Sequence, residues 1–167
     1  MRLITLVAVL VLESVAPGAQ SSDPWAPLQR YIGTWTYEGD NGEGTVTCRS
    51  RRRLITNGAF IESHRECTTP QGPITQVEIF GYSSSRRLYL YWGFNGRGVS
   101  TYTSPTMTDV VVWSGEELSS NNRCTERFAP DHRSSTDVCE HSYNGGKSWV
   151  RLSGGTLTKV ADTADVQ

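Results

Sequence analysis

Short strand-like runs recur at regular spacing along the chain, and this spacing constrains the fold more than any other feature. The runs are rich in β-branched and aromatic residues, and turn signals such as Asn57-Gly58 and Asn95-Gly96 separate them. No run keeps a helical apolar period over several turns. We expect strands over residues 33–39, 44–53, 59–69, 75–82, 87–94, 98–103, 109–114, 121–128, 136–143 and 147–159, the last broken at Gly154-Gly155. Many short, evenly spaced strands predict an all-β barrel or a sandwich.

The first two cysteines fit one hairpin. A two-residue turn at Asn57-Gly58 places Cys48 opposite Cys67. The same register sets two arginines against two glutamates on the other face, Arg49 with Glu66 and Arg53 with Glu62. We therefore expect the disulfide Cys48–Cys67. This register makes it a hydrogen-bonded pair, with Cα atoms about 5.5 Å apart.

The other two cysteines fit a second hairpin, with its turn just after Pro130. That turn places Cys124 opposite Cys139 and also opposes Arg123 to Glu140. An even number of cysteines in an exported chain is typical of a disulfide framework. We therefore expect Cys124–Cys139, again as a hydrogen-bonded pair.

The N-terminus predicts export. Met1-Arg2 precedes an apolar run over residues 3–12, and Ala16-Pro17-Gly18-Ala19 supplies small residues near a cleavage site. This order is typical of a secretory signal peptide, although a buried N-terminal helix is the alternative. We expect a signal peptide over 1–19, one β-barrel domain over 20–160, a disordered tail over 161–167, and a secreted or periplasmic location.

Composition narrows the range of partners. The net charge of −1 gives no electrostatic basis for binding nucleic acid. After the signal peptide, no run is long and apolar enough to cross a bilayer as a helix. Five tryptophans and seven tyrosines, against four phenylalanines, indicate aromatic surfaces that keep a polar atom near water. The sequence does not set the oligomeric state.

One predicted hairpin carries apolar or aromatic side chains on both faces. Leu88, Leu90, Trp92 and Phe94 alternate on one face, opposite Val77 and Ile79, and we expect this face to point inward. The other face carries Glu78, Phe80, Tyr89 and Tyr91. Ligand cavities are mostly apolar. We therefore expect a small apolar ligand to contact Leu90, Trp92 and Phe94, with Trp35 closing the floor of the cavity.

Other chemical groups give weaker signals. Arg49, Arg51, Arg52 and Arg53 form a basic run, which we interpret as a charge-paired strand. His64 and His141 could converge on a metal, but their spacing matches no metal motif, so we expect no metal or cofactor. Glu62 or Glu78 could act as a general acid or base if either faced a cavity. No catalytic motif is present, and we assign no catalytic residue.

The stretch Ser142-Tyr-Asn-Gly-Gly-Lys-Ser-Trp149 matches the spacing of the Asp-box turn of sialidase-type propellers. Such propellers repeat the motif in successive blades, whereas it occurs once here. We therefore predict a tight hairpin with Trp149 packed beneath it.

Two family resemblances follow from these motifs. Gly33-Thr-Trp35 at the head of the first strand resembles the Gly-x-Trp signature of lipocalins and other calycins, which are up-and-down barrels of about eight to ten strands that hold small hydrophobic ligands. Lipocalins also pack a late arginine over this tryptophan, and Arg151 is a possible match. A longer ordered match resembles the secreted bacterial family DUF1579, of unknown function, in Ile32-Gly-Thr-Trp35, Asn57-Gly-Ala-Phe-Ile-Glu62, Ile79-Phe-Gly-Tyr82, Asn144-Gly-Gly-Lys-Ser-Trp149 and Thr158-Lys-Val160.

Both resemblances imply an antiparallel up-and-down barrel, for which we expect about nine or ten strands. Three hypotheses for function follow. The first is an exported barrel that binds or carries a small apolar molecule. The second is a barrel enzyme of isomerase or cyclase type, and the third is an accessory protein that covers a partner. These rest on analogy of fold, so a cavity and the groups inside it must discriminate between them.

Overall fold

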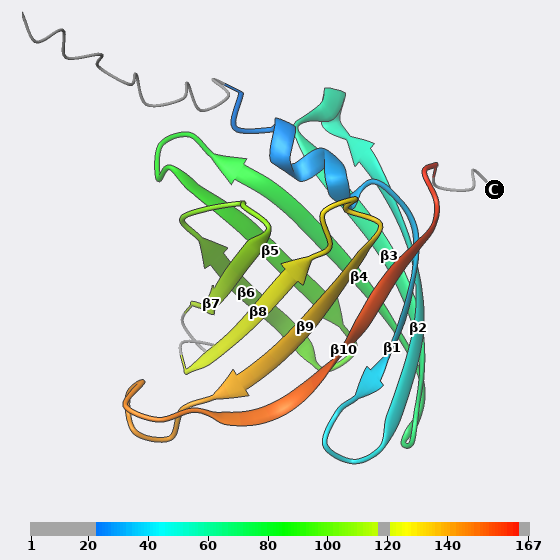
Figure 1. Cartoon of the computed structure of the whole chain (residues 1–167), viewed down its shortest axis with the longest axis vertical. Helices are drawn as coiled ribbons and strands as arrows, with labels where there is room; N and C mark the ends of the chain where they lie inside the picture. Colours follow the sequence, from blue (N-terminus) through cyan, green and yellow to red (C-terminus); the bar gives the residue numbers. More distant parts are fainter. Residues whose placement is uncertain (1–22, 117–120, 164–167) are drawn as a thin grey trace, which may run out of the picture.

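The protein is a closed antiparallel barrel in a computed structural model that describes residues 23–116 and 121–163 (Figure 1). In that part of the chain each strand pairs with its neighbours in sequence, and β1 pairs with β10 to close the ring. The ten strands are β1 (Gly33–Asp40), β2 (Thr45–Ile55), β3 (Phe60–Thr69), β4 (Gly72–Ser83), β5 (Leu88–Asn95), β6 (Gly98–Ser104), β7 (Val110–Gly115), β8 (Asn122–Phe128), β9 (Ser134–His141) and β10 (Val150–Ala161). The predicted up-and-down barrel is confirmed. The predicted signal peptide lies outside the described residues.

A short helix closes one end of the barrel. This 3-10 helix, η1 (Ala26–Tyr31), lies at the end where the chain enters β1 (Figure 1). Its apolar face is deeply inserted, since Leu28 and Tyr31 are 2% and 1% exposed. Arg30 fixes the helix to the β6–β7 connection by donating from Nη2 to the carbonyl oxygen of Met107 at 3.1 Å. No helix among the described residues has the length and apolarity to span a membrane.

Both predicted disulfides are present, Cys48–Cys67 and Cys124–Cys139. The Cα atoms of each pair are 4.0 Å apart, which is typical of a non-hydrogen-bonded pair and not of the bonded pair that we expected. The turn of the first hairpin is longer than the two residues that we predicted. Ile55 and Phe60 form the last pair of the hairpin, and a second 3-10 helix, η2 (Thr56–Gly58), lies between them. The register is as predicted, but the alternation of bonded and non-bonded pairs is shifted by one residue.

Strand β10 passes through Gly154 and Gly155 without the predicted break. A Cβ atom at Gly155 would lie 2.4 Å from the carbonyl oxygen of Glu38, and one at Gly154 would lie 2.7 Å from that of Asp137. These glycines therefore allow close approach of β1 and β9 instead of ending the strand. The strand also includes Ala161, the first residue of the predicted tail.

Alternation along β2 explains what the barrel encloses. The buried residues of β2 are Val46, Cys48, Ser50 and Arg52, and the residues between them are more exposed. Only one of the four arginines in the basic run is therefore inside the barrel. The others remain on the outer surface, where Arg53 pairs with Glu62 at 2.9 Å.

Candidate ligand-binding site

A cavity of about 290 Å³ lies inside the barrel. Tyr31 of η1 lies at its closed end, whereas Asn95 and Ser100 flank the β5–β6 turn at the other end, where Asn95 is exposed. The cavity is lined by Tyr31, Arg52, Arg65, Gln76, Glu78, Phe80, Tyr91, Asn95, Ser100, Tyr102, Trp113, Cys124, Glu126, Asp137, Cys139 and Leu157. A larger depression of about 770 Å³ lies over β1–β4 and β10, but most of its lining residues are exposed. The interior cavity is therefore the better candidate site.

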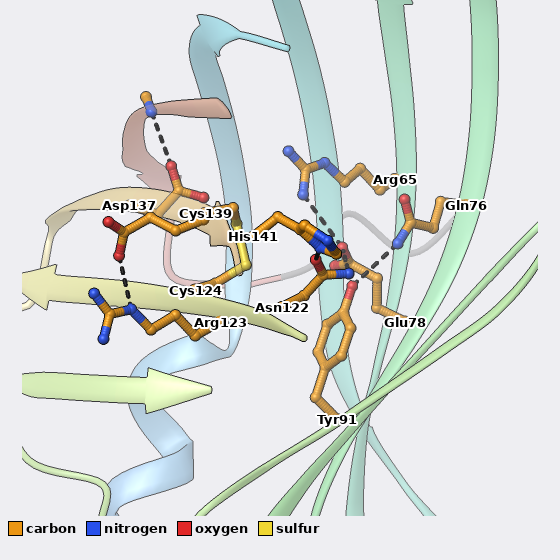
Figure 2. Close-up of a disulfide and its surroundings, with 12 residues drawn as sticks. Arg65, Gln76, Glu78, Tyr91, Asn122, Arg123, Cys124, Asp137, Cys139 and His141 are labelled. Atoms are coloured by element: carbon orange, nitrogen blue, oxygen red, sulfur yellow. Dashed lines mark hydrogen bonds and ion pairs between the residues drawn. A yellow bond between two sulfur atoms is a disulfide. The ribbon is translucent and has the colours of Figure 1, made fainter. Parts of the chain in front are cut away.

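Glu78 is the centre of a buried polar network on β3, β4 and β5. Its side chain is 1% exposed, and its carboxylate accepts hydrogen bonds from Ser63 Oγ at 2.8 Å and from Tyr91 Oη at 3.2 Å. Arg65 Nη1 lies 3.3 Å from the same carboxylate, and Gln76 Nε2 donates to Tyr91 Oη at 3.0 Å (Figure 2). Burial alone would raise the pKa of Glu78, but Arg65 and Arg52 lower it, and the net shift is downward. Glu78 is therefore a carboxylate that balances the arginine charges.

Arg52 enters the cavity from β2 and is enclosed by aromatic rings. Its guanidinium carbon lies 5.5, 5.4 and 5.5 Å from the ring centroids of Tyr31, Trp35 and Phe80. The nearest carboxylate oxygen, on Glu78, is 4.0 Å from its Nη2 atom. Its Nε and Nη1 atoms are buried and have no hydrogen-bond partner among the described residues. Arg52 therefore has unused donors at the cavity wall.

The opposite wall carries two carboxyl groups on β8 and β9. Glu126 accepts hydrogen bonds from Tyr31 Oη at 2.6 Å and from Ser135 Oγ at 2.8 Å. Asp137 accepts a bond from the backbone nitrogen of Gly155 at 2.9 Å. The pKa of Asp137 is raised to about 6, mainly by burial; Arg65 opposes the shift and Glu126 adds to it. Asp137 can therefore change its charge near neutral pH.

Trp35 is buried, as the sequence predicts, but it is not among the residues that line the cavity, where we expected it to close the floor. It is 1% exposed, and its Nε1 donates to the carbonyl oxygen of Tyr31 at 2.9 Å, which joins β1 to η1. Lys159 of β10 lies over its ring, with Nζ at 5.1 Å from the centroid. The predicted candidate for this role, Arg151, instead pairs with Asp40 at 2.6 Å. The late cation over Trp35 is therefore a lysine.

The predicted inward face of β5 was wrong. Tyr91 lines the cavity, so alternation places Leu90, Trp92 and Phe94 on the outer surface, where Phe94 is 42% exposed. The predicted ligand-contact residues Leu90, Trp92 and Phe94 therefore do not line the interior cavity. The physical reason is Glu78, which is on the face that we did not expect to point inward and is buried because arginines, a serine and a tyrosine satisfy its carboxylate.

No family model matches the chain. A search of curated proteins also found no match. The cavity and the groups that line it are therefore the basis for a proposed function.

The histidines of the described residues lie apart from the cavity lining. His64 contacts Glu62 at 3.3 Å, His132 contacts Asp109 at 3.0 Å, and His141 contacts Asn122 at 2.7 Å. Residues 23–116 and 121–163 include no group of three or more His, Cys, Asp or Glu side chains that could hold a metal ion. Of the two glutamates considered as acid–base groups, Glu78 faces the cavity and Glu62 pairs with Arg53 on the outer surface.

The Ser142–Trp149 stretch forms the tight turn that its spacing predicts. Ser142 Oγ accepts a hydrogen bond from the backbone nitrogen of Gly146 at 2.7 Å, and Asn144 Oδ1 accepts one from Ser148 at 2.9 Å. Trp149 lies beside the turn, with the guanidinium of Arg123 at 4.1 Å from its ring centroid. The stretch is therefore a structural turn between β9 and β10.

Sequence reasoning missed Arg52, Arg65, Glu126 and Asp137 as cavity residues. A signal for two of them was available, because Arg52 shares a strand face with Cys48, and Arg65 shares one with Cys67. Both cysteines point inward, since they are 6% and 8% exposed. The strand faces shared with the predicted disulfide therefore point to these two arginines once the inward direction of the cysteines is known.

Proposed function

We propose that this protein is an exported small-molecule-binding barrel and that the interior cavity is its ligand site. The observation that carries the proposal is a cavity of about 290 Å³ that extends from the helix-closed end of the barrel to exposed Asn95. Pockets of roughly 300 Å³ or more, lined by aromatic side chains with a few placed polar groups, are typical of small-molecule sites. The size of the cavity and the aromatic side chains in its lining support this function.

The chemistry of the lining refines the predicted ligand. Phe80, Tyr91 and Trp113 offer aromatic surface for the apolar body of a ligand. Arg52 and Arg65 add buried cationic groups that a purely apolar molecule would leave without acceptors. We therefore propose a ligand with an apolar body and a polar end.

Export is part of the proposal. Two disulfides are consistent with an oxidising environment, such as the extracellular space or the periplasm. The signal peptide at residues 1–19 and the resemblance to DUF1579 remain predictions from the sequence. A carrier or scavenger role outside the cytoplasm fits these features together.

A second candidate is an acid–base enzyme that uses the same cavity. The observation that favours it is Asp137, a cavity carboxyl whose pKa is raised to about 6. A group with a pKa near the operating pH can both take and give a proton. Chemical conversion of a bound compound, detected by mass spectrometry and abolished by Asp137→Asn, would favour the enzyme over the binding protein.

A matched pair of variants tests the binding site. Ser100 lines the cavity near its open end, whereas its neighbour Thr101 pairs with outward-facing Trp92. Ser100→Trp should fill the mouth of the cavity, and Thr101→Trp should add the same side chain to the outer surface. We expect the neutral fluorescent probe N-phenylnaphthylamine to bind wild type and Thr101→Trp with similar affinity and to lose at least tenfold in affinity for Ser100→Trp. Equal binding to all three proteins would contradict an interior site.

A further inference from the structure

We infer that the ligand carries a carboxylate and that Arg52 and Arg65 recognise it inside the cavity. This inference rests on the proposed function and names the chemical class of the ligand for that site. It depends on three features of the wall formed by β2, β3 and β4, which are unused donors, unbalanced charge and neighbouring aromatic surface.

The first feature is the set of unused donors. The Arg52 side chain is only 4% exposed, and its Nε and Nη1 atoms lack hydrogen-bond partners among the residues described. Arg65 Nε is unpartnered in the same way. Buried N–H groups without acceptors are rare and costly in folded proteins. A bound molecule with acceptor oxygens would remove this cost.

The second feature is the charge of the wall. On this wall Glu78 lies between the two arginines, 4.0 Å from Arg52 and 3.3 Å from Arg65, and supplies one negative charge against two positive ones. Asp137 of the opposite wall also acts electrostatically on Arg65. The planar fork of an arginine side chain matches the two oxygens of a carboxylate. One ligand carboxylate would neutralise the remaining charge of this wall.

The carboxyl groups of the opposite wall set a condition on this binding. The Glu126 carboxyl group already accepts hydrogen bonds from Tyr31 and Ser135, so these contacts hold it on its own wall. Asp137 would also repel an anion when ionised, but a pKa of about 6 leaves much of it neutral in mildly acidic solution. The ligand carboxylate should therefore bind near the arginine wall and not at the centre of the cavity.

The third feature gives the body of the ligand. The rings of Tyr91 and Trp113 line the cavity with centroids 6.1 Å apart, and Tyr102 lies 5.8 Å from Tyr91. Aromatic rings pack well against other rings in offset or edge-on geometry. With a volume of about 290 Å³, the cavity suits a small aryl or arylalkyl acid.

Two matched compounds test the class of ligand. Cinnamate and cinnamyl alcohol share an aromatic body and differ in the carboxylate. Isothermal titration of both into the wild-type protein should show cinnamate binding about tenfold or more tighter, because a charge-assisted pair replaces a neutral contact. Equal affinity for both compounds would overturn the carboxylate inference and leave the proposed binding function intact. Binding of neither compound, together with no binding of N-phenylnaphthylamine, would contradict both proposals.

Variants of the two arginines then test whether these residues produce the preference for a carboxylate. Arg65→Gln and Arg52→Gln should each reduce the preference for cinnamate over cinnamyl alcohol to less than threefold. Arg53→Gln, which changes the exposed neighbour of Arg52 on the outer surface, should leave that preference unchanged. Circular dichroism and binding of the neutral probe would show which variants keep the barrel. Arg65 is 20% exposed, so Arg65→Gln serves as the test if Arg52→Gln does not fold. An unchanged preference in a folded Arg65→Gln protein would overturn the inference.

Discussion

Glu126 and Asp137 lie directly opposite each other in the ladder of β8 and β9, and both line the barrel interior. Like charges at opposed positions of a sheet are unfavourable. The protein accommodates the carboxyl groups of Glu126 and Asp137 in different ways. Glu126 receives two hydrogen bonds from hydroxyl groups, whereas burial, and to a smaller extent Glu126 itself, raises the pKa of Asp137 to about 6.

This pair predicts a pH-dependent stability. The pKa of Asp137 is about 6 in the folded protein against 3.8 in its ordinary range, so between these values the folded state holds a proton that the unfolded state releases. The contribution of protonated Asp137 to the free energy of unfolding is therefore complete below about pH 4 and is lost as the pH rises through about 6. Asp137→Asn should remove the cost of ionising this buried carboxyl group. At pH 8 the free energy of unfolding of the variant should therefore exceed that of wild type by up to about 3 kcal/mol.

Thermal or urea unfolding at pH 4 and pH 8 measures this effect. At each pH the variant is compared with the wild-type protein. The asparagine oxygen can still accept the hydrogen bond from the backbone nitrogen of Gly155, so the substitution mainly removes the charge. A difference between variant and wild type that is the same at both pH values would show that Asp137 does not titrate as described.

Trp35→Ala should lower the free energy of unfolding by roughly 3–5 kcal/mol, as expected for a large aromatic side chain removed from a core. The variant loses the hydrogen bond to Tyr31 and the ring over which the cationic groups of Arg52 and Lys159 lie. Because β1 and η1 meet at this residue, we expect loss of folding and not of binding alone. Trp149→Ala, at a half-buried turn position, should cost less in the same melts. A Trp35→Ala protein that melts within a degree or two of wild type would contradict the role assigned to this residue.

Adjacent residues on β5 separate the inner from the outer face. Tyr91→Leu should weaken binding of a cavity probe, because it removes a lining ring and the hydroxyl that contacts Glu78 and Gln76. Trp92→Leu should leave the affinity within about twofold of wild type, because the change is on the outer surface and keeps the position apolar. Fluorescence titration of both variants with N-phenylnaphthylamine gives the comparison. The opposite order of effects would favour the outer face as the binding surface.

The fold could be predicted from the sequence because its strongest signals are local. Turn residues set the strand boundaries, and the opposed cysteines fixed two registers that the structure confirms. The hydrogen-bonding class of each cysteine pair could not be predicted, because it depends on the length of the connection. A two-residue turn at Asn57-Gly58 and a longer connection centred on the same residues give the same register. They differ in whether Cys48 and Cys67 form a hydrogen-bonded or a non-hydrogen-bonded pair.

The candidate site was harder to predict, because apolar content misidentified the inner face of β5. Leu90, Trp92 and Phe94 make the more hydrophobic face, but burial follows the satisfaction of Glu78 by groups on other strands. Arg65 and Ser63 lie on β3, so this satisfaction depends on long-range contacts that no pattern within β5 records. Hydrophobic alternation is a weak guide where both faces are aromatic.

Both disulfides should stabilise the barrel. Cys124 and Cys139 are separated by 15 residues and Cys48 and Cys67 by 19. Loops of this size predict a loss of about 3 kcal/mol when either bond is removed by paired alanine substitution. Urea unfolding of each paired variant measures the cost, and peptide mapping without reduction checks the connectivity. A linkage between the two hairpins, such as Cys48 with Cys124, would contradict the structure.

A crystal structure of the protein with N-phenylnaphthylamine tests the central claim most directly. The account predicts density for one probe molecule inside the barrel, in contact with the rings of Tyr91 and Trp113 and below Ser100 at the mouth. Density against the outer surface at Trp92 and Phe94, with the interior filled only by side chains and solvent, would contradict it.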